Sequence, residues 1–186
     1  SVEFKTSSKT CFGAVYDERE AFKNAALLKC RLEMVTIILD DYERLLQMQQ
    51  GKLKKKESRV DVMKFFNELT EFASIQSNNG VNVTKSVVTS CVFLSFDAVH
   101  LRYVLVNLVS NAVKFTLQGT IMVRVTHMYP ASLQINVEDS GCGIVAEDTQ
   151  DLFACPFHNV DKVVHLKCGL YLSHLVTSRV LGGALT

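Results

Sequence analysis

Two asparagines and a lysine stand at helical spacing in the middle of the chain. Asn107 and Asn111 are four residues apart, and Lys114 follows about one turn later, so they share one side of a helix. An asparagine side chain offers a neutral oxygen to a hard cation and an N–H to a phosphate, and a lysine adds positive charge for the same phosphates. The trio suggests a site for a magnesium–nucleotide complex, although surface asparagines without any ligand fit the spacing equally well.

The second candidate is the sequence DSGCGI at residues 139–144. Glycines at positions 141 and 143 allow the backbone to turn sharply and leave no side chain to keep a flat ligand away. Asp139 comes at the end of an apolar, strand-like segment, where its carboxylate can accept a hydrogen bond from an exocyclic amine such as adenine N6. The alternative is an ordinary strand-to-helix turn that Asp139 caps.

The segments around these residues are expected to position them. Residues 101–116 have leucine, valine and alanine at every third or fourth position, which predicts a helix that packs on a sheet. Asp97 precedes this helix and is expected to cap it. Residues 120–127 and 133–137 alternate apolar and polar side chains, which predicts two half-buried strands joined by a turn at 129–132.

Upstream of Asp97 we expect a helix and two short strands. The helical pattern covers residues 60–77, and Asn78-Asn79-Gly80 indicates a turn. Strands are predicted at residues 81–85 and 91–95. The lysine-rich run at 51–62 follows a helix stop at Gly51 and is interpreted as a solvated linker, with a domain boundary after residue 56.

The first 50 residues contain one glycine and no proline and are rich in helix-forming residues. They predict two helices, the first from about residue 4 to 22 and the second with an apolar stripe from Leu28 to Leu46. Two antiparallel helices have too little core to be stable alone. A homodimer in which residues 1–56 of two chains form a four-helix bundle is therefore expected.

The composition is that of an ordinary globular protein, with 48% hydrophobic and 21% charged residues. The net charge of +1 gives no electrostatic argument for nucleic acid or an anionic membrane. No apolar run approaches the roughly 20 residues that a membrane span needs, and the N-terminus is too polar for a signal peptide. The six cysteines form no CxxC pair, as expected of reduced thiols. We expect a soluble, cytoplasmic chain or a piece of a larger protein.

The order of the motifs resembles that of one family. After NLVSNAVKFT and two strands come DSGCGI, DLFACPF at residues 151–157 and GLYLSHLVTSRVLGG at residues 169–183. This order is similar to that of the ATP-binding domain of sensor histidine kinases, a branch of the ATPases shared with gyrase, Hsp90 and MutL. The resemblance implies an α+β fold class: a dimerisation and phosphotransfer hairpin at 1–56, then a two-layer α/β sandwich of the histidine-kinase and Hsp90-like ATPase type at 57–186.

The resemblance also implies ATP and Mg²⁺ as ligands and a role for each site residue. Asn111 would coordinate the magnesium ion, with Asn107 facing the phosphates beside it, and Lys114 would contact phosphate. Asp139 would hold the adenine amine. The other implied positions are Gly141 and Gly143, which shape the adenine pocket, Phe153 and Phe157, which anchor the front of the nucleotide lid, and Gly169, which remains from the second glycine box.

Two departures from the family pattern bear on activity. Family members begin the hairpin with a histidine that accepts the phosphoryl group, and Val2 stands at that position here. The second glycine box is reduced to LKCGLYL at residues 166–172, where bulky Tyr171 replaces a glycine. Fewer glycines leave a poorer backbone cradle for phosphates.

The sequence therefore predicts a pseudokinase: a signalling protein of the two-component or phosphorelay type that binds Mg–ATP weakly and does not autophosphorylate. Its partners would be a second copy through residues 1–56 and a receiver domain or a competent kinase. Two alternatives stay open, an active histidine kinase or ATPase acting in trans and a nucleotide-free dimeric interaction module.

Overall fold

A computed structural model describes residues 39–128, 132–144, 152–153 and 168–186 and divides the chain into two units, Ser1–Leu46 and Gln47–Thr186. Residues 39–49 are helical, in agreement with the end of the second predicted helix. The helices expected before residue 39 and most of the turn at 129–132 lie outside the described residues. The domain boundary expected after residue 56 stays a prediction.

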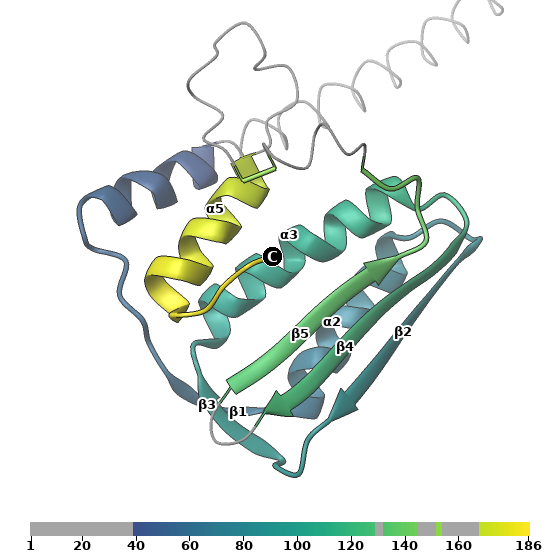
Figure 1. The fold of residues 1–186 in the computed structure, drawn as a ribbon, viewed down its shortest axis with the longest axis horizontal. Coiled ribbons are helices and arrows are strands. Elements are labelled where there is room, and N and C mark those ends of the chain that lie inside the picture. The colour runs from purple at the N-terminus through teal and green to yellow at the C-terminus, as the bar shows by residue number, and fades with distance from the viewer. Residues whose placement is uncertain (1–38, 129–131, 145–151, 154–167) are drawn as a thin grey trace, which may run out of the picture. The chain divides into compact units, whose positions relative to one another are not determined.

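The described part of the larger unit is a mixed α/β fold (Figure 1). In chain order its elements are β1 (Ser58–Asp61), α2 (Val62–Gln76), β2 (Val81–Val88), β3 (Phe93–Phe96), α3 (Ala98–Phe115), β4 (Gly119–Met128), β5 (Ser132–Asp139), α5 (Cys168–Val176) and the π-helical η3 (Thr177–Leu181). One sheet has the order β2-β4-β5, with β2 parallel and β5 antiparallel to β4. The other pairs β1 with β3. None of the described helices is both long and apolar enough to cross a membrane.

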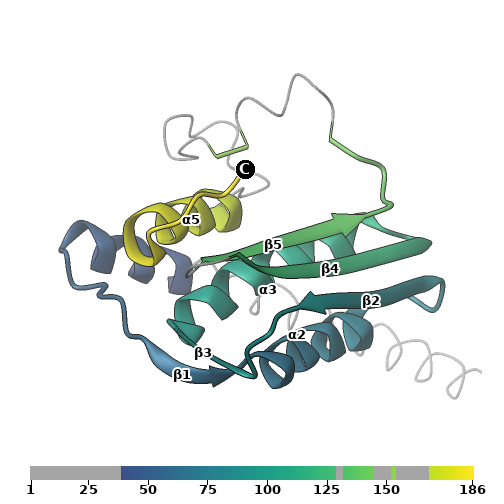
Figure 2. The ribbon, with the colours of Figure 1, turned by 60° about the horizontal axis from the view of Figure 1, so that its bottom comes forward.

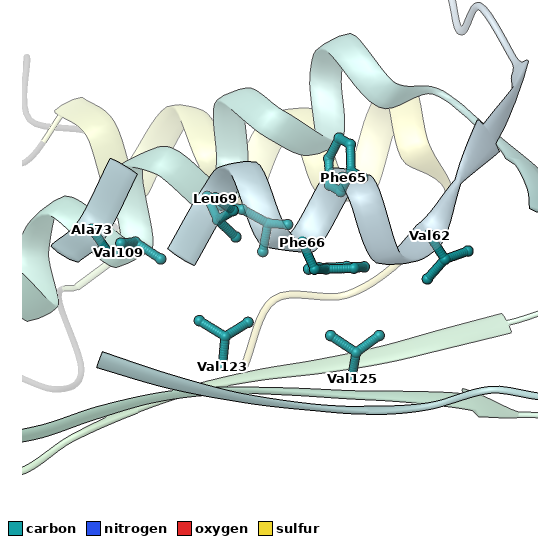
Figure 3. Packing of buried hydrophobic residues seen from close by; sticks show 9 residues of the cluster. Val62, Phe65, Phe66, Leu69, Ala73, Val109, Val123 and Val125 are labelled. Atoms are coloured by element: carbon teal, nitrogen blue, oxygen red, sulfur yellow. The ribbon is translucent and has the colours of Figure 1, made fainter. Parts of the chain in front are cut away.

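The hydrophobic core lies between the three-stranded sheet and the helices α2 and α3, which cover the same face of the sheet (Figure 2). Val123 and Val125 of β4 are fully buried and point toward the two helices, where Phe66, Leu69 and Val109 meet them (Figure 3). The alternation along β4 and the apolar stripe of α3 predicted this arrangement. Each such side chain contributes about 1.5–3 kcal/mol by leaving water, so the sheet and α3 are held together firmly.

α3 begins directly after the predicted cap Asp97 and ends at Phe115, so it contains nearly all of the predicted range 101–116. The side chain of Asp97 accepts a hydrogen bond from His100 N at 3.0 Å, which satisfies one of the free N–H groups at the helix start. The helix ends at Phe115, and Thr116 N bonds to Ala112 O. α5 lies beside this helix (Figure 1).

The prediction for residues 51–62 was wrong in part. Residues 58–61 form β1, which pairs antiparallel with β3 from Ser58↔Phe96 to Asp61↔Phe93. Val60 belongs to this strand and not to the following helix. α2 begins only at Val62, because Asp61 caps it by accepting a hydrogen bond from Lys64 N at 2.9 Å. An aspartate just before a helical pattern is the signal that would have located this boundary.

The two strands before Asp97 differ from their predicted limits. β2 runs three residues further than expected, to Val88, because its parallel register with β4 continues to Val88↔Thr126. β3 begins at Phe93 rather than at Cys91, after Val92 O has accepted a hydrogen bond from Val62 N at 3.1 Å. The strands β4 and β5 contain the predicted ranges 120–127 and 133–137.

Candidate functional site

α3 carries three of the predicted site residues. Asn107, Asn111 and Lys114 all lie on this one helix, and the two asparagines are about 6 Å apart along its axis. Both asparagines are half-buried, whereas Lys114 is exposed, with its Nζ 5.1 Å from the centroid of the Phe115 ring. A lysine in the last turn also interacts favourably with the negative end of the helix dipole. The helix thus presents two amide groups and a charge along one side.

Asn107 is joined to α5. Its Nδ2 donates to Ser173 Oγ at 3.3 Å, and Ser173 is fully buried. Gly169, on the same helix as Ser173, lies against this amide: a Cβ at position 169 would stand 3.4 Å from Asn107 Oδ1. The structure therefore brings together two residues that are 62 positions apart in the sequence, and it engages the Asn107 amide nitrogen with a neighbouring helix. Ser173 was not among the predicted site residues, and its only sequence signal is one hydroxyl inside the apolar run LYLSHLV.

The loop after β5 closes against the end of α3. Gly141 N donates to Asp139 Oδ1 at 2.9 Å, so the carboxylate stabilises the turn, as the capping alternative expected. A Cβ at Gly141 would come within 2.5 Å of the Phe115 carbonyl oxygen and 2.8 Å of Asp139 Oδ1. Only glycine fits there. This contact fixes the exposed Asp139 beside the helix that carries Lys114.

The second glycine of this loop has a different role. Gly143 has a φ of +71°, and a Cβ there would meet nothing within 4 Å. Its backbone conformation, and not a lack of space, favours glycine. Among the described residues, Asp139 Oδ2 accepts no hydrogen bond, so one oxygen of the carboxylate is available to another donor.

Phe153 stacks on α5. Its ring and the imidazole of His174 have centroids 5.2 Å apart and an interplanar angle of 24°. Phe153 was predicted to lie at the front of a nucleotide lid. It contacts α5, the helix that also contains Gly169. Phe157, the other predicted lid residue, lies outside the described residues.

The donors on α3 suit a magnesium–nucleotide complex better than a metal held by protein alone. Within the described parts of the chain, no group of three or more His, Cys, Asp or Glu is placed to hold a metal ion. Mg²⁺ usually keeps several waters and binds through one or two protein oxygens together with substrate phosphates. Asn111 with one amide oxygen, Asn107 facing the phosphates and Lys114 with its charge would fit that kind of partial coordination. The Gly141 turn, which a Cβ would fill, leaves Asp139 accessible.

Comparison with known proteins gives a family match over a range that contains α3, β4, β5 and α5. Residues 96–186 match the family described as histidine kinase-, DNA gyrase B-, and HSP90-like ATPase. Aerobic respiration control sensor protein ArcB of Escherichia coli (strain K12) is 32% identical over 120 residues, which cover 63% of this chain and 15% of ArcB. The chain thus spans only a small part of that relative.

Two solved structures have a similar fold. Full-length ShkA in complex with AMPPNP gives a TM-score of 0.66 at 16% identity and covers 95% of this chain and 35% of ShkA. Histidine kinase ThkA in complex with response regulator protein TrrA gives a TM-score of 0.53 at 16% identity, with 91% of this chain and 54% of that chain covered. Residues 96–186 are thus similar to this ATPase family, and 120 residues of the chain are similar to a part of ArcB. The two solved structures are both 16% identical to this chain and show a likeness of fold.

Proposed function

We propose that this chain is a sensor histidine kinase-like signalling protein that binds Mg–ATP weakly and does not phosphorylate itself. The observation that carries the proposal is the combination of a retained donor set on α3 and β5 with a valine at position 2. Phosphoryl transfer depends on a nucleophile held in line with the γ-phosphate. Valine has no atom that can accept the phosphoryl group, so the usual reaction has no acceptor within the chain.

Asn111 and Lys114 would bind the phosphate end of the nucleotide, and Asp139 would bind the adenine end. ATP with Mg²⁺ would supply the transferable phosphoryl group, and Asn111 would give its amide oxygen to the ion. Lys114 would balance phosphate charge. At the other end, Asp139 Oδ2 would accept a hydrogen bond from the exocyclic amine of adenine, because Oδ1 is already used by Gly141 N. A hydrogen bond to a charged acceptor is worth about 1.5–3 kcal/mol, so Asp139 would select for an amine at this position.

Weak affinity is expected from the phosphate end. The Asn107 amide nitrogen already donates one of its two hydrogens to Ser173 Oγ, so only one hydrogen is left for a phosphate and the amide is held in the orientation of the bond to α5. The segment 166–172 also has fewer glycines than a backbone phosphate cradle uses. Each net hydrogen bond that is lost costs about 1 kcal/mol, which is about a fivefold increase in Kd.

The helix at residues 39–49 supports dimerisation. Leu39, Tyr42 and Leu46 are exposed, and their spacing of three and four residues is that of a seam between packed helices. A second copy of the chain would cover this stripe. A response regulator is a further partner, since the name of the ThkA complex includes one. In this scheme the chain signals through its partner's chemistry or through its own conformation.

Two other functions have some support. An active kinase or ATPase acting in trans is favoured by the retained Asn111, Lys114 and Asp139. A nucleotide-free interaction module is favoured by the engagement of Asn107 with Ser173 and by the exposed stripe on helix 39–49. Nucleotide binding separates the module from the other two functions, and phosphate transfer separates the pseudokinase from the active enzyme.

The deciding experiment is a thermal-shift titration with ATP and Mg²⁺. Ligand at 100 times its Kd stabilises a protein by about 2.7 kcal/mol, which is easily measured. We expect a shift in the wild type, none in Asn111→Ala and an unchanged shift in Asn136→Ala, because Asn136 is exposed on β5 and its side chain is on the opposite face of the sheet from the core residue Val137. No shift in the wild type would leave only the interaction module. Acid-labile phosphate on this chain after incubation with labelled ATP would refute the pseudokinase.

A further inference from the structure

The segment that connects helix 39–49 to β1, residues 50–57, is hydrogen-bonded to that helix at its start and to Asp97 at its end. At its start, Gly51 takes a φ of +63° and closes the helix, with Gly51 N bonded to Met48 O at 3.0 Å and Lys52 N bonded to Gln47 O at 2.9 Å. At its end, Lys56 N donates to Asp97 Oδ2 at 2.6 Å. The backbone of this connecting segment is thus bonded to the residue at which α3 begins.

The Asp97 carboxylate accepts hydrogen bonds from three donors. Its Oδ1 accepts from His100 N at 3.0 Å, and its Oδ2 accepts from Lys56 N and lies 2.7 Å from His100 Nδ1. The residue has no exposed surface, and His100 is 9% exposed. Because an ionised carboxylate can only accept, Nδ1 carries the hydrogen. A buried charge is costly unless it is hydrogen-bonded. Loss of the bond from Lys56 N would therefore destabilise the charged form of Asp97 that caps α3.

The connecting segment also contacts α3 further along. Leu53 of this segment, together with Met48 at the end of helix 39–49, packs on a buried cluster of Val104 from α3, Val176 from α5 and Val180 from η3. Leu108, the neighbour of Asn107, packs on the same cluster. The connecting segment therefore contacts α3 both at its cap and within one turn of the first site asparagine.

We propose that Asp97 is a positioning residue that couples the connecting segment to the nucleotide site on α3. When the segment is bonded at Lys56, the first turn of α3 is capped and the helix holds Asn107, Asn111 and Lys114 in place. When the segment moves away, the carboxylate loses a donor and the helix start frays. A movement of helix 39–49 that pulls on the connecting segment would thereby change the affinity for nucleotide. This inference rests on the proposed binding of Mg–ATP.

The coupling has to be reciprocal. If the bond at Lys56 raises the affinity for nucleotide by some factor, bound nucleotide must stabilise that bond by the same factor. A merely structural cap would not transmit an effect of ligand on α3 to an amide outside the helix. The exchange rate of the Lys56 amide with and without nucleotide is therefore a specific readout.

The test uses backbone substitution, because the Lys56 side chain is exposed and the bond is made by its N–H. Lys56→Pro removes the N–H, whereas Lys56→Ala keeps it. Lys55→Pro controls for proline in the same segment, since Lys55 N donates to no described group and its side chain makes only an exposed ion pair with Glu57. For each chain, Kd for Mg–AMPPNP is measured by calorimetry and amide exchange is followed at residues 98–103. Exchange at residue 56 is followed in the chains that keep its N–H.

We expect Lys56→Pro to raise Kd about five- to tenfold, within the usual range of coupling between sites, and to speed exchange at residues 98–103 about tenfold. Lys56→Ala and Lys55→Pro should stay within about twofold of the wild type. In an Asp97→Asn background, the further change to Lys56→Pro should have less than a twofold effect, because the acceptor is already altered. Saturating nucleotide should slow exchange of the wild-type Lys56 amide.

Three results would overturn the inference. One is Lys56→Pro behaving like Lys56→Ala in both measurements, and another is an equal effect of Lys56→Pro with and without Asp97→Asn. The third is an exchange rate of the Lys56 amide that is the same with and without bound nucleotide. If the wild type binds no Mg–AMPPNP, the proposed function fails and the coupling to nucleotide fails with it. Exchange at residues 98–103 would then still report whether Asp97 joins the connecting segment to α3.

Discussion

The amide of Asn107 on α3 donates to the buried hydroxyl of Ser173 on α5 at 3.3 Å. The same amide is the group that would donate to a phosphate, so helix packing uses one of its two hydrogens and restrains the direction of the other. Several consequences of this and of the neighbouring contacts can be measured.

Removal of the Ser173 hydroxyl should separate stability from binding. Ser173→Ala loses a buried hydrogen bond and is expected to lower the free energy of unfolding by about 1 kcal/mol. Because the Asn107 amide is then free to turn and has both hydrogens available, the Kd for Mg–ATP should stay equal or fall by up to about fivefold. Urea unfolding and calorimetry measure the two quantities. Ser178→Ala, at an exposed serine a few residues further on, is the control. Weaker nucleotide binding in Ser173→Ala would show that the bond to Ser173 does not restrain the Asn107 amide against a phosphate.

The two glycines of the loop after β5 should differ when each is changed to alanine. Gly141→Ala forces a Cβ against the Phe115 carbonyl and is expected to cost about 1–3 kcal/mol and to displace Asp139, with loss of nucleotide binding. Gly143→Ala costs about 1–2 kcal/mol, because of its positive φ, but has open space. It should keep binding within a few-fold of the wild type. Equal loss of binding in both variants would show that Asp139 does not depend on the Gly141 contact.

A histidine at position 2 should restore an acceptor. In the proposed scheme Val2→His gains acid-labile phosphate when it is incubated with labelled ATP and Mg²⁺, and the wild type gains none. The double variant Val2→His with Asn111→Ala should lose the label again, because the magnesium ligand is gone. Label that survives Asn111→Ala would mean that the phosphate comes by a route that does not use α3.

Acid should remove a contribution of Asp97 to stability. Burial raises the pKa of Asp97, but the hydrogen bonds from Lys56 N and His100 and the nearby imidazole outweigh it, so the pKa lies below its ordinary value of 3.8. Between the folded and unfolded pKa values the unfolded chain binds more protons, so stability rises with pH. The contribution is complete above about pH 4 and is lost below it. Urea unfolding from pH 3 to 6 should give a shallower acid slope for Asp97→Asn, and identical slopes would contradict this.

The exposed stripe on helix 39–49 should control association. Tyr42→Asp places a charge in the middle of the stripe formed with Leu39 and Leu46 and is expected to dissociate a dimer into monomers. Gln49→Asp adds the same charge at another exposed position of the helix and should leave the dimer intact. Sedimentation velocity at several concentrations distinguishes the outcomes, and a wild type that is monomeric throughout would refute dimerisation.

Local patterns were sufficient to predict α3, β4 and β5. The Asp97 cap and the apolar stripe define α3, and the strict alternation around Val123 and Val125 defines β4. β1 was missed because Val60 continues the helical pattern of α2 by itself, and only its pairing with Leu94, 34 positions away, makes it a strand. Periodicity contains no information about such distant partners.

The same limit applies to the site. The sequence identified Asn107 and Gly141 as candidates, but it assigned Gly141 to ligand access, whereas its nearest neighbour is the Phe115 carbonyl. Likewise, no residue near Asn107 in the sequence indicates that it contacts Ser173. Both contacts join elements that become adjacent only when α3 and α5 pack together and β5 ends beside the helix.

The parallel pairing of β2 with β4 has a consequence for how this domain can be divided. The parallel partner of β4 is β2, which precedes Asp97 in the chain. The core residues Phe66 and Leu69 also precede Asp97. α3 is the main part of the crossover between these two strands, so it docks only when β2 has joined the sheet. A fragment cut at residue 96, where the family match begins, would expose the inner side of α3 and leave one edge of β4 bare. The smallest independently folding piece is therefore larger than the segment by which the domain is recognised.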